Sequence, residues 1–533
     1  MFDEINIFND SNNNLKKLFF FYFAVAVCGY LGLMMYGYPY SDDHCRYLVN
    51  INVGTLSSAR YLTLMIEIFT YLSTVITDAA PFSQILSCAF LSYTAVICLK
   101  IFKIDLNDKL QILCFAPVVV NPYMLEIMLF RFDNPFSTLA LLLVVASAYL
   151  SSFNAKKFWI PQTAILFLSF FMYQIAASAY FIICAYTFLK EIRDGKTLKQ
   201  TISEMRYWAY TILTVACCYF PFTHFLKYSV AENGKSFAIP KDWESIKIIA
   251  ANGYKYFSNL YMDWSDNTIG QIFFTLFAIF VINMLVQTYR KTKSIVSVTS
   301  SCLGIFIFSL CPLGTCIILR IISFAGNESI LPRCLYSFGL LISLVCYENY
   351  KIFGKIKIAR RFFAFLMVIL CLWNIIFLNS AANVIRYFRM IQQNVLYDIS
   401  KDIYEITNKN PKISGVCVTG SIKTNVTVNF VKSYPIIDRL IPEKWRIPYL
   451  CQIALMNPDF CDGVLKYLPL EKTLEENRYR NKKKIKKTSH YDVYTLDDKI
   501  VVFKLRNKTN YDDNCITYAQ IKDEVDKKTS AHH

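Results

Sequence analysis

Two adjacent aspartates, Asp42 and Asp43, follow the first long apolar run of the chain, within residues 38–46. Neighbouring carboxylates repel each other, and burial raises the pKa of at least one of them. Such a pair suits a general base, or ligands for a divalent cation that prefers oxygen. The sequence Pro-Tyr-Ser-Asp-Asp is equally typical of a solvated turn after a helix. The pair alone leaves both interpretations open.

A second group of ionisable residues lies within the mostly apolar residues 126–135, which include Arg131 and Asp133. Charged side chains among so many apolar neighbours cost free energy, and they are therefore candidates for a functional role. The alternative is that the arginine and the aspartate pair with each other, or extend to a membrane interface.

Uncharged hydrogen-bonding groups and two further arginines complete the set. Tyr173-Gln174 offers a hydroxyl and an amide that suit the hydroxyls of a sugar, although a helical hairpin would also tolerate them. Arg320 and Arg333 flank a short polar break, and a guanidinium group binds a phosphate through two hydrogen bonds. Polar groups on one side of a bundle favour a shared cavity over independent turns.

The elements that must position these residues are membrane helices. The 533-residue sequence is 55% hydrophobic and only 18% charged, against roughly 25% charged residues in globular proteins. Its longest apolar runs approach the ~20 residues that cross a bilayer as a helix. We expect about eleven such spans, at residues 18–36, 82–99, 110–123, 135–150, 158–172, 175–189, 208–225, 269–288, 295–312, 334–347 and 362–378.

Basic residues indicate the orientation of these spans. With a cytoplasmic N-terminus, the inner loops hold more Lys and Arg than the outer loops, as charge-directed insertion produces. These loops explain much of the formal net charge of +17, so no nucleic-acid partner is expected. Residues 61–76 have apolar residues at helical spacing around Glu67, which predicts an amphipathic helix at the outer surface. An odd number of spans places the two termini on opposite sides.

The composition changes near residue 382. Residues 1–381 form the predicted transmembrane domain, and residues 382–533 are polar and lysine-rich, with the length of an ordinary soluble domain. Segments 413–418 and 499–505 have the pattern of strands, and segment 391–406 that of a helix. We therefore expect a mainly α membrane bundle followed by a soluble α+β domain on the outer side.

The eighteen cysteines form no Cys-x-x-Cys pair and no Cys/His metal spacing, and most suit small core residues. Cys451 and Cys461 lie in the tail, where a disulfide would form if that domain is extracytoplasmic. The lysine-rich segment 481–487 is most simply a solvated loop, and contact with a lipid phosphate or an anionic glycan is the alternative.

Several short motifs follow one another on the expected outer side: Asp42-Asp43 with Arg46, then Arg60-Tyr61-Leu62, Arg131-Phe132-Asp133-Asn134-Pro135 and Tyr173-Gln174. In this order they resemble the GT-C glycosyltransferases, and more narrowly the serotype-converting O-antigen glucosyltransferases of bacteria and their phages. The resemblance covers residues 18–380, and Ala59 stands where the family pattern would have glycine.

The resemblance implies a GT-C type bundle in the bacterial inner membrane, with the active site and the C-terminal domain facing the periplasm. It implies undecaprenyl-phosphate glucose as the donor and a lipid-linked O-antigen unit of lipopolysaccharide as the acceptor, with serotype conversion as the result. An acceptor hydroxyl would attack the anomeric carbon in line while the lipid phosphate leaves, inverting that carbon. Asp42 is the first candidate for the base and Asp43 the alternative.

Charge on the leaving phosphate needs stabilisation, which Arg333, Arg320 or Arg131 would supply. The sequence demands no cofactor, and it leaves open a divalent cation, Mg²⁺ or Mn²⁺, on Asp42 and Asp43. The other residues expected to bind substrate are Arg46, Arg60, Asp133, Asn134, Tyr173 and Gln174.

Two other functions stay open at the level of sequence. An O-antigen polymerase would depend on the outer arginines and not on the aspartate pair. A flippase or transporter of lipid-linked sugars calls for ionisable residues deep within spans and for related halves of the chain, neither of which is visible. A nucleotide-sugar site is not expected, because no Rossmann-like glycine fingerprint occurs.

Overall fold

The computed structural model describes most of the chain, namely residues 12–37, 39–40, 43, 60–71, 77–225, 243–264, 267–313, 331–413, 415–419, 430–431, 434–441, 466–467, 484–496 and 500–506. The chain folds into two compact units. Unit 1 contains Met1–Arg386 together with Phe430–Ile441, and unit 2 contains Tyr387–Asn429 and Pro442–His533. A short segment from the tail therefore belongs to the first unit.

Within the described residues, seven helices are long and apolar enough to cross a membrane. Each coincides with a predicted span, so the chain has the helices of a protein that crosses the bilayer several times. They are α1 (Asn12–Met34), α5 (Phe82–Ile101), α9 (Asn134–Asn154), α11 (Ala177–Arg193), α14 (Thr268–Thr292), α15 (Ile295–Leu310) and α18 (Lys357–Lys409).

The other four predicted spans are shorter or less apolar. Three of them lie in α10 (Trp159–Phe170), α12 (Leu198–Phe225) and α17 (Phe338–Phe353). Residues 110–123, expected as one span, are instead two short helices, α6 (Lys109–Leu113) and α7 (Ala116–Val119). Pro117 in the first turn of α7 has no N–H with which to continue the hydrogen bonding of α6. The total of about eleven spans stays a prediction.

Shorter elements join these helices at the end of the bundle that holds Asp43. The helix expected at residues 61–76 is confirmed as α4 (Tyr61–Tyr71), with Glu67 buried and Met65 and Phe69 exposed, while residues 72–76 lie outside the described residues and its place at the outer membrane surface stays a prediction. The others are α8 (Met124–Leu129), α13 (Trp243–Trp264), α20 (Ile436–Leu440) and the 3₁₀ helices η1 (Gln174–Ala176), η3 (Cys311–Leu313) and η4 (Pro332–Leu335).

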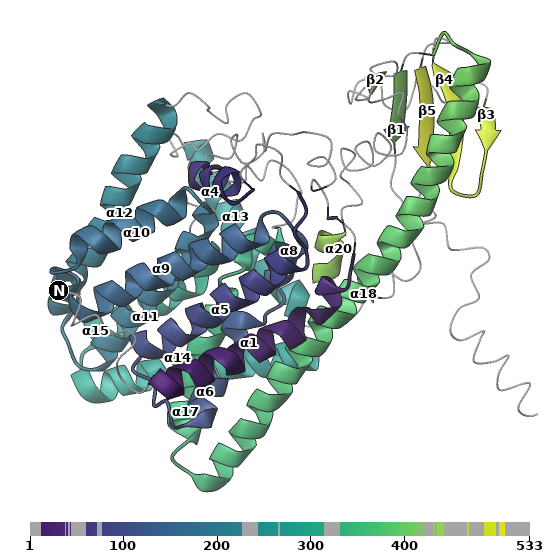
Figure 1. The fold of residues 1–533 in the computed structure, drawn as a ribbon. Helices are drawn as coiled ribbons and strands as arrows, with labels where there is room; N and C mark the ends of the chain where they lie inside the picture. The colour runs from purple at the N-terminus through teal and green to yellow at the C-terminus, as the bar shows by residue number, and fades with distance from the viewer. Residues whose placement is uncertain are drawn as a thin grey trace, which may run out of the picture. The chain divides into compact units, whose positions relative to one another are not determined.

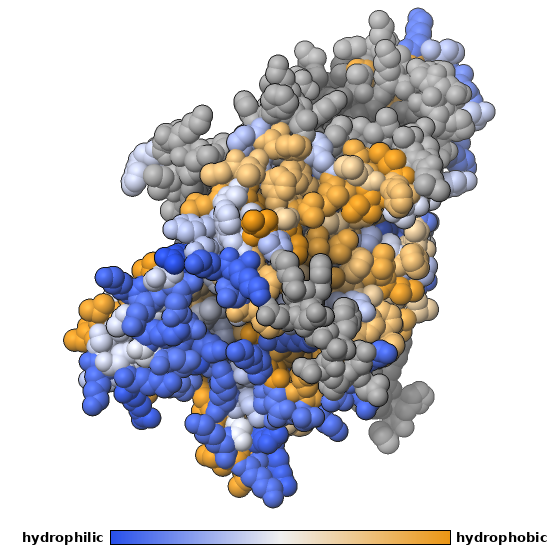
Figure 2. Space-filling view, turned by 60° about the vertical axis from the view of Figure 1, so that its left-hand side comes forward, coloured by the Kyte–Doolittle hydropathy of each residue, from blue (hydrophilic) through white to orange (hydrophobic). Residues whose placement is uncertain are grey.

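The outer faces of the long helices are apolar. Phe20, Ile282, Leu303 and Phe362 are each exposed by 60% or more. Exposed apolar surface of this extent is costly in water and suited to lipid, and Figure 2 shows hydrophobic surface beside a strongly hydrophilic end.

Polar contacts hold the inner faces together. Helices α1, α5 and α9 lie side by side (Figure 1). The Asn379 amide of α18 donates to the Cys28 carbonyl at 2.9 Å, and its Oδ1 accepts from the Gly32 N–H at 2.8 Å. This pair of bonds joins α1 to α18 through a polar side chain, as is common between membrane helices.

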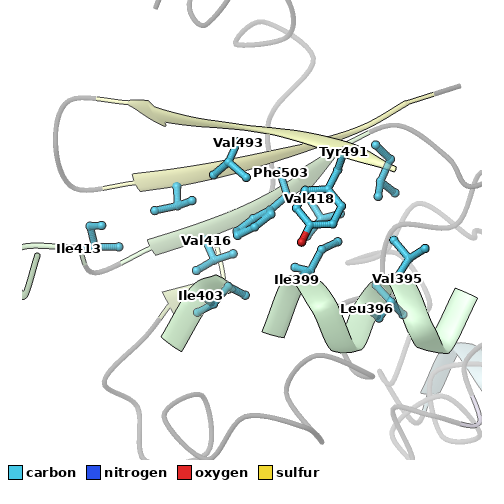
Figure 3. Close-up of a cluster of buried hydrophobic side chains, with 12 residues drawn as sticks. Val395, Leu396, Ile399, Ile403, Ile413, Val416, Val418, Tyr491, Val493 and Phe503 are labelled. Carbon is cyan, nitrogen blue, oxygen red and sulfur yellow. The ribbon is translucent and has the colours of Figure 1, made fainter. Parts of the chain in front are cut away.

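Unit 2 is a mixed sheet with one helix packed on it. Its strands β1 (Gly415–Thr419), β2 (Lys466–Tyr467), β3 (Lys484–Lys487), β4 (Tyr491–Leu496) and β5 (Ile500–Leu505) have the order β2-β1-β5-β4-β3. Strand β1 is parallel to β2 and β5, whereas β4 is antiparallel to β3 and β5. Figure 3 shows Ile399 and Ile403 of α18 facing Val416, Val418 and Phe503 of the sheet.

The strands and the helix expected at residues 413–418, 499–505 and 391–406 are confirmed as β1, β5 and part of α18. The prediction of a solvated loop at residues 481–487 is wrong for the second half of this segment, because Lys484–Lys487 is the exposed edge strand β3. Lysines on an edge strand discourage pairing with another chain. Cys451 and Cys461 lie outside the described residues.

Candidate functional site

Asp43 lies buried at the end of unit 1 where α1 ends and α9 begins. Its Oδ2 accepts a hydrogen bond from the Arg131 backbone N–H at 2.9 Å, and the residue has no exposed surface. A donor of this kind stabilises the negative charge of the carboxylate. Asp42, Arg46 and Arg320, also expected at the site, lie outside the described residues.

Aromatic packing holds the segment before Asp43. The Tyr40 ring meets the Phe130 ring edge-on, with the centroids 4.9 Å apart. The Tyr40 hydroxyl donates to the Leu440 carbonyl of α20 at 2.7 Å. The Asp43 segment is thereby fixed against both the α8–α9 connection and the returning tail segment.

Arg131, in the connection between α8 and α9, contacts acidic residues through both its backbone and its side chain. While the N–H binds Asp43, the guanidinium pairs with Asp78, with Nη1 and Oδ2 2.7 Å apart. Asp78 lies just before α5 and was not expected at the site. Arg131 therefore links the acidic residue of the first loop to the start of the second long helix.

Arg60 stands at the start of α4 between a carboxylate and a ring. Its Nη1 is 3.5 Å from Asp133 Oδ2, and its guanidinium lies 4.7 Å from the centre of the Tyr173 ring. The helix is held in place by the Leu62 N–H, which donates to the Phe171 carbonyl at 3.1 Å. A guanidinium over an aromatic face gains a cation–π attraction.

Tyr173 is buried, and the charges of two arginines act on its phenol. Burial raises the pKa of its phenol, while the charges of Arg60 and Arg333 act to lower it. Within the described residues the Tyr173 hydroxyl has no hydrogen-bond partner, and its ring packs against Tyr336 at 5.6 Å. Gln174, predicted as its neighbour in the site, instead uses its amide to donate to a hydroxyl inside the bundle, that of Tyr219, at 2.8 Å.

Arg333 is held by Glu126, one of the ionisable residues of segment 126–135 that the sequence marks as candidates for a functional role. The Arg333 N–H donates to Glu126 Oε2 at 2.8 Å, and Nη1 donates to Oε1 at 2.9 Å. Its guanidinium also lies 5.1 Å from the centre of the Phe130 ring. Glu126 was not among the residues expected to bind substrate, although its place inside an apolar run made it a candidate.

The Asn134 side chain is hydrogen-bonded within the protein. Its Oδ1 accepts from the Ser87 hydroxyl at 3.0 Å, its Nδ2 donates to the Met128 carbonyl at 3.4 Å, and the residue has no exposed surface. These bonds join the start of α9 to α5 and α8. Both polar groups of the Asn134 side chain are thus engaged within the protein, where they hold the neighbouring Arg131–Asp133 segment in place.

A second buried charge pair, which no sequence signal indicated, lies at the same end. Arg439 of α20 forms an ion pair with Asp263 of α13. Asp263 also accepts from the Tyr123 hydroxyl at 2.8 Å, and the Trp264 indole donates to that hydroxyl at 3.0 Å. Burial raises the pKa of Asp263, with Arg439 and Tyr123 acting in the opposite direction.

An apolar groove of about 290 Å³ runs between α10 and α12. The Tyr61 ring of α4 packs near both helices, 6.0 Å from the Phe171 ring and 6.3 Å from the Phe222 ring. Arg60 thus lies at the end of the two helices that line the groove. Its lining residues are Trp159, Ile160, Thr163, Ala164, Phe167, Thr214, Val215 and Cys218.

A metal site is not formed by the described residues alone, among which no group of three or more His, Cys, Asp or Glu side chains is placed to hold an ion. Asp43 contributes one carboxylate, one oxygen of which is engaged by the Arg131 N–H. The divalent cation considered for Asp42 and Asp43 stays a prediction.

The model of the glucosyl transferase GtrII family matches residues 31–344, which include every described residue of the candidate site except the α20 segment. The chain belongs to the GtrII glucosyl transferase family. A relative in Salmonella phage P22, described as an uncharacterized 55.3 kDa protein in the gtrB 5′ region, is 23% identical over 450 residues, covering 81% of this chain and 89% of the relative. No solved structure matches the chain.

Proposed function

We propose that this GtrII family member is an inverting glucosyltransferase that moves glucose from undecaprenyl-phosphate glucose to a lipid-linked O-antigen unit at the periplasmic face of the bacterial inner membrane. The observation that carries the proposal is the buried Asp43 held by the Arg131 N–H, with the charges of Arg60 and Arg333 acting on the buried Tyr173 at the same end of the bundle. One carboxylate and several guanidinium groups are what this transfer requires.

In the proposed reaction, an acceptor hydroxyl forms a bond to the anomeric carbon as the bond to the donor phosphate oxygen breaks. Asp43 or Asp42 takes the hydroxyl proton, and the lipid phosphate leaves with the electron pair. The anomeric configuration inverts because the attack is in line. A leaving phosphate needs charge stabilisation more than a proton, which arginine side chains supply.

We assign the phosphate first to Arg60. Its contact with Asp133 is 3.5 Å, whereas the contacts of Arg131 and Arg333 with their carboxylates are 2.7 Å and 2.9 Å. The guanidinium with the longer contact gives up the least on turning to a phosphate. The Arg60 guanidinium lies over the Tyr173 ring, and we assign the Tyr173 hydroxyl, which has no partner among the described residues, to a sugar hydroxyl.

The groove between α10 and α12 is the proposed seat of the polyprenyl chain. It is apolar, and Tyr61 connects its helices to Arg60. A phosphate at Arg60 would therefore place the attached isoprenoid units along a surface that exposes almost no polar groups.

Transfer by the purified full-length chain from radiolabelled undecaprenyl-phosphate glucose to a lipid-linked O-antigen acceptor tests the proposal. Asp43→Asn and Asp42→Asn should both fold, and at least one should abolish transfer. Full transfer by both variants would overturn the catalytic assignment. Label that crosses a vesicle membrane without forming a glycosidic bond would identify a flippase, and joined O-antigen units without added glucose would identify a polymerase.

The same assay tests the divalent cation. Activity that EDTA removes and Mg²⁺ or Mn²⁺ restores would assign an ion to Asp42 and Asp43. Activity unchanged by EDTA would assign both carboxylates to acceptor binding and proton transfer.

A further inference from the structure

A second cavity, of about 490 Å³, lies where α6 meets the beginning of α18. Figure 1 shows α6 and α17 at the opposite end of the helical bundle from α8 and α20, and so from Asp43. The polar residues that line the cavity are Asn107, Asp108, Lys109, Lys357, Arg360 and Arg361. The proposed glucosyl transfer uses none of them.

The single carboxylate of this cavity is fully committed to the fold. Asp108 begins α6 by accepting from the Leu110 N–H at 3.0 Å, and it also accepts from the Tyr350 hydroxyl at 2.5 Å. Its remaining charge pairs with Arg360, with Oδ2 and Nη2 2.9 Å apart. One of the four cations is therefore neutralised inside the cavity.

The other three cations that line the cavity are not neutralised. Lys109, Lys357 and Arg361 are exposed, and none of them takes part in an ion pair among the described residues. Three uncompensated positive charges around one hollow repel one another, so an anion bound there lowers the free energy of the assembly.

Apolar residues next to these cations indicate which kind of anion is bound. Ile358, Phe362 and Phe365 share one side of α18 and are exposed by 80%, 60% and 60%. They belong to a candidate membrane span that begins at Lys357. The cavity is thus at the boundary between a lipid-facing surface and a cationic one, which a soluble anion does not require.

We propose that this cavity binds the phosphate headgroup of an anionic phospholipid, with phosphatidylglycerol as the probe, and that the acyl chains lie along Ile358, Phe362 and Phe365. Arg361 would bind the phosphate oxygens through its planar fork, and Lys109 and Lys357 would act as point charges. If Asp43 faces the periplasm, the bound lipid belongs to the cytoplasmic leaflet. The lipid site does not depend on the transfer reaction.

Native mass spectrometry of the detergent-purified full chain, titrated with phosphatidylglycerol, tests the lipid site. The double variant Lys357→Gln/Arg361→Gln should weaken the tightest phosphatidylglycerol complex at least about tenfold, because each cation near a lipid phosphate contributes about 1 kcal/mol. Lys199→Gln/Arg290→Gln removes two exposed cations that do not line the cavity, and its affinity should match that of the unchanged chain.

Two further arms separate the sources of the anion. Phosphatidylcholine carries no net charge and should not compete, and glycerol 3-phosphate, which has no acyl chains, should bind far more weakly than the lipid. Equal phosphatidylglycerol affinity in the two double variants would overturn the site, and glycerol 3-phosphate binding as tightly as the lipid would overturn the lipid assignment. Lys109→Gln, at an exposed position of α6, repeats the measurement if the double variant does not fold.

Discussion

Arg60 has the longest ion-pair contact of the three described arginines of the site, and that makes it the most informative residue to change. Arg60→Ala should lower kcat/KM for glucosyl transfer about 100-fold or more, since it removes charge stabilisation of the leaving phosphate. Arg60→Lys should recover part of this loss, because lysine keeps the charge and loses the fork. Steady-state transfer assays with the purified chain measure both.

Arg206→Ala is the matched control for Arg60. Arg206 lies exposed on α12 and also stacks on an aromatic ring, that of Tyr207 at 5.1 Å. It should leave kcat/KM unchanged. Equal activity of Arg60→Ala and the control would remove Arg60 from the site.

The Tyr173 hydroxyl permits a sharp comparison between binding and folding. Tyr173→Phe removes a hydroxyl without a partner among the described residues, so the free energy of unfolding should change by no more than about 0.5 kcal/mol. If that hydroxyl binds a sugar, KM should rise about fivefold to tenfold. Thermal melting and KM, measured on the same preparation, separate the two effects.

Tyr219→Phe should behave in the opposite way. It removes the acceptor of the buried Gln174 amide and should cost about 1 to 3 kcal/mol of stability, with KM little changed. An unchanged KM in Tyr173→Phe would exclude the hydroxyl from substrate binding.

The limits of sequence reasoning at this scale are physical. Arg60, Arg131 and Arg333 were found because a charge next to an apolar run is a local signal. The roles of Glu126 and of Asn134 were not, because they depend on partners that only the fold brings near: Glu126 binds a residue 207 positions away. Tyr173 and Gln174 are adjacent in the chain yet face different partners.

At the scale of elements, the groove between α10 and α12 allows a test of where the polyprenyl chain of the donor binds. Ala164→Trp should fill the groove and raise KM for a donor with a full-length polyprenyl chain, while kcat changes little. A donor with a short isoprenoid chain should be affected much less, since it does not reach the filled part. Transfer rates with the two donors measure the difference.

Leu168→Trp, on the same helix, is the control, because Leu168 is exposed by 44% and does not line the groove. The seat of the polyprenyl chain would have to lie elsewhere if both tryptophan variants raised KM equally.

A second prediction at this scale concerns the ion pair that joins helix α20 to α13. Arg439→Met should destabilise unit 1 by about 3 to 5 kcal/mol, because it leaves the buried Asp263 carboxylate without its counter-charge. Adding Asp263→Asn to this variant should restore much of the loss, since the amide carries no charge. Unfolding of the purified chain, followed by melting temperature, gives the coupling between the two positions.

No restoration in the double variant would mean that the ion pair is not what holds α20. No sequence pattern could have predicted this helix in unit 1, because it packs on residues such as Tyr40, 400 positions away. The long apolar helices were predictable, since their signal lies within each segment.

At the scale of the whole molecule, the number of membrane crossings depends on residues 109–130. The chain enters this stretch beside the Asp108 cavity and leaves it at the Arg131 N–H that binds Asp43, at the opposite end of the bundle. Every residue from 114 to 130 is buried. Non-helical backbone is tolerated at membrane depth where protein covers it, so the short helices α6, α7 and α8 are able to form one broken crossing.

The broken crossing decides on which side the loop after α9 lies, and a reporter measures it. Alkaline phosphatase fused after Lys157 should be inactive, because its disulfides form only outside the cytoplasm, and a broken crossing makes α9 the fourth span. If only the seven long helices cross, α9 is the third span and the same fusion is active. A fusion after Lys199 should be inactive and one at the C-terminus active both for the predicted spans, about eleven in number, and for the seven long helices alone, which makes these two the controls for orientation. A reversed pattern in the controls would move Asp43 to the cytoplasmic side and exclude a periplasmic acceptor.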